Sequence, residues 1–205
     1  MSKEKKTNTL WIVKMGILLA IMLLFSFTSL GYIKVGVIEI TMMVLPVAVG
    51  GIVLGPLAGA ILGTFFGITS FIQCFGMSAF GVLMLSLNPL GAAITCIVPR
   101  FLCGFIPALI FRSFSKNNRS NVATILLASI LTAVLNTIFF MLSVIIFFWH
   151  NNSFMSTMAD WGVAMDSIWL FFIAFVGLNG VIEAAFNAVV ATAVSKVLFK
   201  LEKRD

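Results

Sequence analysis

Charged residues are scarce in this 205-residue chain. They make up 10% of the sequence, whereas apolar residues make up 61%. Soluble proteins typically contain about 25% charged and roughly 45–50% apolar residues. So few charges cannot cover the surface of a soluble domain of this length, but they suit a protein whose solvent is the bilayer interior. The composition therefore predicts an integral membrane protein.

The residues and motifs of common enzymes are also missing. His150 is the single histidine and lies in a loop, so no histidine-based metal site is expected. No P-loop is present, so the chain is not expected to hydrolyse ATP. Gly76-Met-Ser78-Ala only faintly resembles an intramembrane serine protease, because the glycine after the serine is absent and no histidine lies in a span. We therefore expect no enzyme and no cofactor.

Cysteine is used sparingly. Cys74, Cys96 and Cys103 all lie in apolar segments and show no Cys-x-x-Cys spacing. A free cysteine commonly packs as a small hydrophobic residue. We expect all three to be packing residues and expect no metal site at them.

Long apolar runs dominate what is present. A spanning helix needs about 20 mostly apolar residues, and unbroken runs differ from the alternating pattern of transmembrane β-strands. The sequence predicts an all-α membrane protein, a bundle of six transmembrane helices that forms a single domain over residues 1–205. The expected helices are 10–30, 40–54, 57–75, 90–113, 122–149 and 167–199.

Basic residues predict the orientation of these helices. Of the 13 lysines and arginines, all but Lys34 and Arg100 fall in the tails, at the cytoplasmic helix ends or in the polar loop 115–121. Cytoplasmic segments carry an excess of such residues. We expect a multi-pass protein of the cell membrane with both termini in the cytoplasm. The segments expected to face outward are 31–39, 76–89 and 150–166, the last bordered by Trp149, Trp161 and Trp169.

Small residues recur at four-residue intervals in two places. Gly55, Gly59, Gly63 and Gly67 form one stripe, and Gly16-x-x-x-Ala20 is a second, shorter pattern. Small residues on one helical face let another backbone approach closely. The stripe predicts either packing within the chain or a surface on which a partner docks.

Two ionisable residues lie inside expected spans. Arg100 is about ten residues into its helix, which is about 15 Å at 1.5 Å per residue. A charge at that depth is costly and should face a cavity or a partner. Arg100 therefore either pairs with Glu183 in the last helix or neutralises an anionic ligand.

Amides accompany these charges. Asn179, Glu183 and Asn187 form one polar stripe at four-residue spacing, and Asn136 lies near the middle of the 122–149 helix. Buried amides need hydrogen-bond partners. Interhelical hydrogen bonds would satisfy them, and so would a polar pocket for a small molecule.

The arrangement resembles a known family. Six helices, a short second helix and Leu54-Gly-Pro-Leu-Ala-Gly-Ala-Ile-Leu-Gly63 opening the third are similar to the substrate-binding S components of energy-coupling factor (ECF) vitamin transporters. Gly16-x-x-x-Ala20 resembles the small-residue signature with which that family docks onto its coupling subunit. The 178–187 stretch resembles the ligand-lining last helix of the family.

The resemblance implies a mechanism. An S component captures a vitamin from outside and associates with a module of one membrane coupling subunit and two ATPase subunits. The docking residues it implies are Gly16, Ala20, Gly55, Gly59 and Gly63. The substrate-binding residues are Arg100, Asn136, Asn179, Glu183, Gln73 and Asn88.

The segments 70–76, 87–91 and 99–104 are most similar to the pantothenate type, and Arg100 suits a carboxylate ligand. Riboflavin or another vitamin is the alternative within the family. Outside it, the alternatives are a self-sufficient secondary transporter, which usually contains paired broken helices in two repeats, and a structural membrane protein, which needs no polar pocket. No internal repeat is visible.

Overall fold

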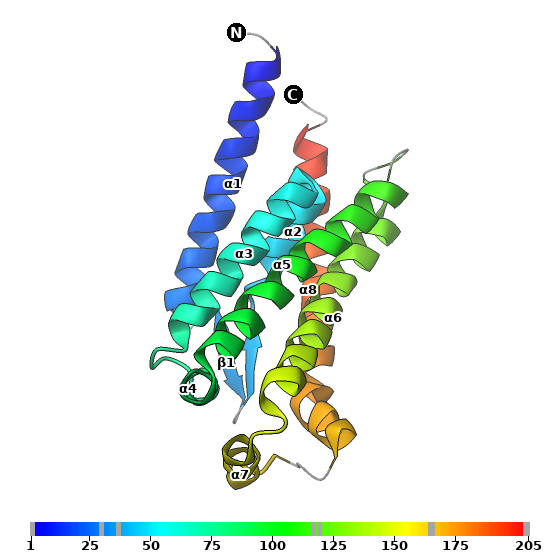
Figure 1. The fold of residues 1–205 in the computed structure, drawn as a ribbon. Coiled ribbons are helices and arrows are strands. Elements are labelled where there is room, and N and C mark those ends of the chain that lie inside the picture. The colour runs from blue at the N-terminus through cyan, green and yellow to red at the C-terminus, as the bar shows by residue number, and fades with distance from the viewer. Residues whose placement is uncertain are drawn as a thin grey trace.

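The computed structural model of the chain describes residues 3–28, 31–35, 38–115, 118, 120–163 and 167–202. In this part the chain is a bundle of helices with one small hairpin (Figure 1). The elements in order are α1 (Lys3–Phe27), β1 (Tyr32–Val35), β2 (Ile38–Thr41), α2 (Val44–Leu54), α3 (Pro56–Gln73), α4 (Ala79–Leu87), α5 (Pro89–Phe114), α6 (Val122–Phe148), α7 (Asn152–Asp160) and α8 (Ile168–Glu202).

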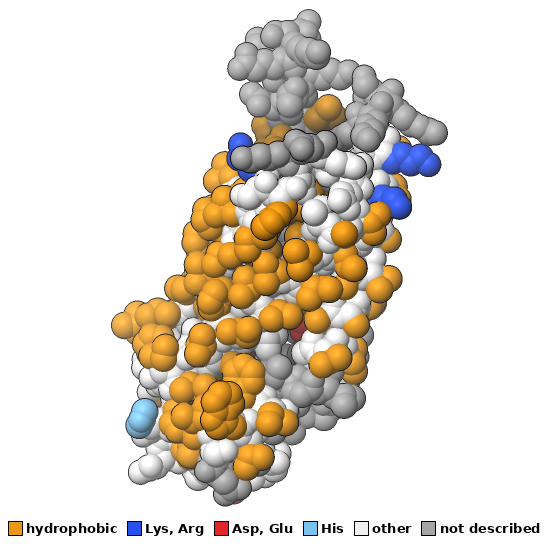
Figure 2. Space-filling view, turned by 90° about the vertical axis from the view of Figure 1, so that its right-hand side faces the viewer, with side chains coloured by type: hydrophobic (Ala, Val, Ile, Leu, Met, Phe, Trp, Pro, Cys, Tyr) orange, Lys and Arg blue, Asp and Glu red, His pale blue; other side chains and the backbone are white. Residues whose placement is uncertain are grey.

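Six of these helices match the six expected from the sequence. The helices α1, α3, α5, α6 and α8 each contain a segment long and apolar enough to cross a membrane, and α2 is a shorter apolar helix. The prediction of an all-α membrane protein is confirmed, and the chain is a multi-pass membrane protein. Hydrophobic side chains cover much of the middle of the bundle, while lysines and arginines gather at one end (Figure 2).

The segments expected to be outward loops contain short elements. Residues 32–35 and 38–41 form an antiparallel hairpin in which Lys34 faces Glu39 in register. Because residues 38–41 pair in this way, α2 begins at Val44 and not near residue 40 as expected. Ser78 caps α4 by accepting a hydrogen bond from Gly81 N at 3.4 Å, and Asn151 caps α7 similarly.

These short elements gather at one end of the bundle. The hairpin, α4 and α7 lie at the end opposite to the start of α1, the end of α8 and the α5–α6 connection (Figure 1). Both chain ends are therefore on the same side, as an even number of crossings requires. Which side is cytoplasmic stays a prediction from the basic residues.

A tight turn joins α2 to α3. Gly55 has a φ of 102°, a conformation that glycine adopts at little steric cost. Pro56 follows as the first residue of α3, where a missing N–H is tolerated. This turn lets α2 fold back along α3.

The glycine stripe of α3 packs against α5. A Cβ atom on Gly59 would collide with the carbonyl group of Gly104, and one on Gly63 would collide with the carbonyl group of Arg100. Gly67 faces the backbone at Ile97 in the same way. The stripe therefore serves packing within the chain, which was the first of its two interpretations.

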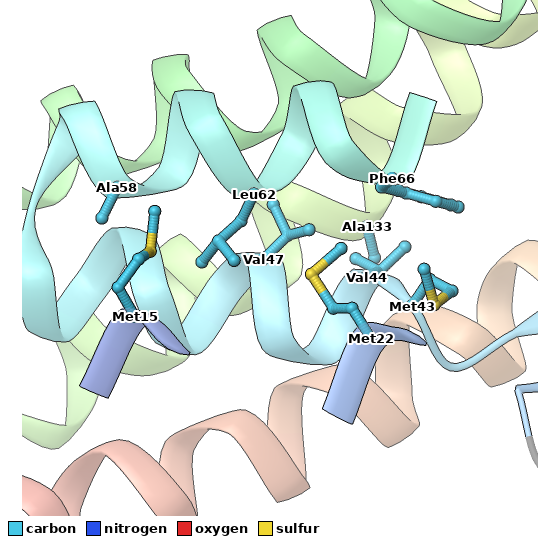
Figure 3. Packing of buried hydrophobic residues seen from close by; sticks show 9 residues of the cluster. All are labelled: Met15, Met22, Met43, Val44, Val47, Ala58, Leu62, Phe66 and Ala133. Atoms are coloured by element: carbon cyan, nitrogen blue, oxygen red, sulfur yellow. The ribbon is translucent and has the colours of Figure 1, made fainter. Parts of the chain in front are cut away.

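A core of methionines and branched side chains joins α1 to the other helices. Met15 and Met22 of α1 point toward Val44 and Val47 of α2 and toward α3 (Figure 3). The remaining members of this cluster are Met43, Ala58, Leu62, Phe66 and Ala133. Close van der Waals packing of such side chains stabilises the bundle even where α1 contributes only a few of its residues.

Candidate ligand-binding site

Arg100 is held inside the bundle by a proline beside it. Pro99 has no N–H, so it cannot make the helical hydrogen bond to the carbonyl of Thr95 four residues earlier. The Arg100 Nη1 atom donates to that Thr95 oxygen instead, at 2.6 Å. The guanidinium therefore donates to the Thr95 carbonyl, which lacks its usual helical hydrogen bond because of Pro99.

Two aromatic rings contact the same guanidinium. Its Cζ atom lies 4.4 Å from the ring centre of Phe140 on α6 and 5.4 Å from that of Phe66 on α3. Contacts of this kind stabilise a cation that has lost its water. Arg100 is 8% exposed, and its Nε atom has no hydrogen-bond partner in the described part of the chain. The arginine is thus positioned by three helices and keeps a donor available.

Glu183 on α8 lies near Arg100 but does not form a salt bridge with it. The two side chains interact electrostatically, and Glu183 also interacts with the backbone of Thr41 at the end of β2. Its Oε1 atom is buried, and none of the described residues forms a hydrogen bond with it. The direct Arg100–Glu183 pair considered from the sequence is therefore absent, and each group retains unused hydrogen-bonding capacity.

Cys103 marks the point where the three helices meet. Its Sγ atom lies 3.2 Å from the carbonyl oxygen of Arg100 and 3.9 Å from Oδ1 of Asn136. The thiol also lies within electrostatic range of Glu183. Arg100 of α5, Asn136 of α6 and Glu183 of α8 thus all lie near Cys103, and their place in a ligand pocket stays a prediction.

Other polar residues of the predicted site serve mainly in packing. Asn187 donates through Nδ2 to the Ser129 carbonyl at 2.7 Å, an interhelical bond between α8 and α6. Gln73 donates to the Ser26 carbonyl at 2.7 Å. The side chain of Asn179 lies outside the described residues. Interhelical hydrogen bonding therefore accounts for part of the polar pattern.

Asn88 is placed away from the Arg100 cluster. Its Oδ1 atom accepts from Gly91 N at 2.9 Å and caps the start of α5. Twelve residues separate it from Arg100, or about 18 Å along a helix. The structure assigns Asn88 a capping role and does not bring it to Arg100.

Sequence reasoning missed the partners that position Arg100. Phe66 and Phe140 are two among 21 phenylalanines, and no local pattern distinguishes them. Thr95 carried a signal, because a proline four residues after it frees its carbonyl. Cys103 was interpreted as a packing residue; it is buried and also borders this polar cluster.

The predicted docking residues divide into two groups. Among the described residues, no atom of another segment lies within 4 Å of a Cβ position on Gly16, and Ala20 is also exposed, so this face of α1 is open. Gly55, at the α2–α3 turn, is likewise free of such contacts. Gly59 and Gly63 are instead covered by α5 of the same chain.

A buried guanidinium with amide and carboxyl groups around it suits a binding subunit for a small polar molecule. The family described as ECF transporter, substrate-specific component, matches residues 11–195. The chain belongs to this family of transporter components, which confirms the resemblance seen in the sequence.

The chain is also similar to a curated transporter. The chain is 28% identical over 182 residues to the pantothenate transporter PanT of Leuconostoc mesenteroides subsp. mesenteroides. The match covers 85% of this chain and 84% of that protein. The two proteins are thus similar along most of their length.

Proposed function

We propose that this chain is the high-affinity pantothenate-binding subunit of an ECF-type ABC importer. The observation that carries the proposal is the buried Arg100, whose Nε donor has no partner among the residues that the structure describes. A relative named as a pantothenate transporter supports the choice of vitamin.

The chemistry of pantothenate matches these groups. Its carboxylate is the partner that a guanidinium binds best, through charge-assisted hydrogen bonds in a fixed fork geometry. Its hydroxyl and amide N–H groups are donors for the Oε1 atom of Glu183, and Asn136 offers an amide beside them. A ligand with a carboxylate and hydroxyl donors can therefore form hydrogen bonds with both Arg100 and Glu183.

Energy for transport comes, in this proposal, from a module of one membrane coupling subunit and two ATPase subunits. The open Gly16–Ala20 face of α1 is the docking surface for the coupling subunit, because small exposed residues allow close helix approach. Binding on α1 leaves the polar cluster between α5, α6 and α8 undisturbed.

A titration against a vitamin panel tests the ligand. The detergent-purified chain is expected to bind pantothenate saturably, as measured by calorimetry or native mass spectrometry. Riboflavin serves as the matched control and is expected not to bind. Tight riboflavin binding without pantothenate binding would assign the chain to another vitamin, and binding of neither would favour a different transporter class.

Cysteine labelling tests the orientation. A membrane-impermeant thiol reagent added outside is expected to modify Met155→Cys on α7 but not Asn118→Cys in the α5–α6 connection. The reason is that the two positions lie at opposite ends of the bundle (Figure 1). Labelling of residue 118 from outside contradicts cytoplasmic termini.

A further inference from the structure

Two cysteines from different helices lie in contact beside the candidate site. Cys74 ends α3, Cys96 lies about two turns into α5, and both are buried. Their Sγ atoms are 3.7 Å apart. Ser70 accompanies them, with its carbonyl 3.4 Å from Cys74 Sγ and its hydroxyl 4.0 Å from Cys96 Sγ. The two thiols are therefore each other's neighbours in the packed interior.

The third cysteine provides an internal comparison. Cys103 lies two turns after Cys96 on the same helix and is fully buried. Its sulfur atom contacts oxygen atoms of Arg100 and Asn136. All three thiols are within electrostatic range of Arg100, so what distinguishes Cys74 and Cys96 is their contact with one another.

The Cys74–Cys96 pair lies next to an exposed turn. Phe75, Gly76 and Met77 follow Cys74 directly and are exposed, at the end of the bundle that carries α4 and α7 (Figure 1). A small, uncharged oxidant therefore has a short path to Cys74. By contrast, Cys103 lies deeper along α5 and beneath the Arg100 cluster.

We propose that Cys74 and Cys96 are a dithiol modification site, which peroxides oxidise to a Cys74–Cys96 disulfide. One thiolate attacks the peroxide O–O bond and becomes a sulfenic acid, releasing water after protonation; the second thiol attacks that sulfur and displaces a second water. The two sulfurs together lose two electrons and two protons, and hydrogen peroxide is reduced to two waters.

Formation of the bond requires the two sulfur atoms to approach. A disulfide has a sulfur separation of about 2.05 Å, so from their present 3.7 Å the two atoms must approach by about 1.7 Å. The bond would tie the end of α3 to α5, one helical turn before Arg100.

Counting free thiols in the unmodified full-length protein tests the proposal. The detergent-purified chain is treated with hydrogen peroxide, quenched, unfolded and alkylated with N-ethylmaleimide. The wild-type chain has three cysteines, and we expect the number of alkylated thiols to fall from three to one. Non-reducing peptide mass spectrometry is expected to show residues 74 and 96 linked, and dithiothreitol should restore all three thiols.

Single serine variants provide matched controls. Cys103→Ser is expected to leave the link intact, whereas Cys74→Ser and Cys96→Ser should abolish it. Three thiols remaining after peroxide treatment, oxygen added to isolated cysteines, or a link that includes Cys103 would each overturn the proposal. Because the main readout uses the wild-type chain, a serine variant that fails to fold does not remove the test.

Discussion

The helices α1 and α3 both carry small residues at four-residue spacing, yet the structure uses them differently. In the most apolar stretch of α3, 56% of residues are buried, against 17% in α1. Gly59 and Gly63 touch the backbone of α5, while Gly16 faces open space. The same spacing of small residues thus packs against α5 in α3 and leaves an exposed face on α1.

The largest effect is expected from filling the α3 stripe. Gly63→Leu places a branched side chain against the Arg100 carbonyl, where even a Cβ atom collides. Overpacking typically costs 1–3 kcal/mol, and a backbone contact cannot yield easily, so we expect about 3 kcal/mol or more. Detergent-exchange melting and size-exclusion profiles measure it. A protein with unchanged stability would show that the α3–α5 contact is looser than described.

Replacing Arg100 is expected to lower the affinity for pantothenate. Arg100→Ala should cut pantothenate affinity by about 2–5 kcal/mol, the range for truncating one partner of a buried charge pair. Arg100→Lys should recover only part of it, because an ammonium lacks the guanidinium fork. Isothermal titration of the three proteins measures the effect.

The competing account of Arg100 is a structural role with Glu183. It predicts unchanged affinity in Arg100→Ala and stability restored by adding Glu183→Gln, since a lone buried charge is worse than none. Melting temperatures of both single variants and the double variant distinguish the accounts. That combined outcome would remove Arg100 from the ligand site.

Filling the open face of α1 is expected to act on assembly alone. A Cβ atom at Gly16 meets no described atom of another segment within 4 Å, so stability and pantothenate affinity of Gly16→Leu should match those of the wild type. Association with a coupling subunit should weaken at least about tenfold, or about 1.4 kcal/mol. Co-purification with the energising module measures it. Equal losses of assembly and ligand affinity would mean that the α1 face only holds the monomer together.

The smallest effect on pantothenate affinity is expected from replacing Pro99, the residue before Arg100. Pro99→Ala restores an N–H that can bond the Thr95 carbonyl and so competes with Arg100 Nη1. One hydrogen bond is worth about 1 kcal/mol, so pantothenate affinity should fall several-fold while the melting temperature does not fall. Pro107→Ala, a proline further along the same helix, is the control and should leave affinity unchanged.

Much of the fold was predictable because a spanning helix must satisfy its backbone internally and must be apolar for about 20 residues. Those requirements appear directly as apolar runs. The hairpin, α4 and α7 were not expected, because short elements depend on tertiary contacts: Phe154 and Met158 of α7 are buried in a cluster with Met84 and Phe148.

The candidate site was predictable in part for a related reason. Charges and amides are conspicuous in apolar helices, so Arg100, Asn136 and Glu183 were identified without a structure. Gln73 and Asn88 were chosen through a resemblance of segments, and the structure gives them hydrogen bonds to Ser26 and Gly91. Their place in ligand binding stays a prediction.

The membrane environment, the six main helices and the few polar groups inside them follow from composition along the chain. Tertiary packing accounts for the rest: Phe66 and Phe140 surround Arg100, Glu183 lies near it without forming a salt bridge, and one glycine pattern is covered while the other is open. Those outcomes depend on which helices contact each other, and this is set by close packing between residues far apart in the chain.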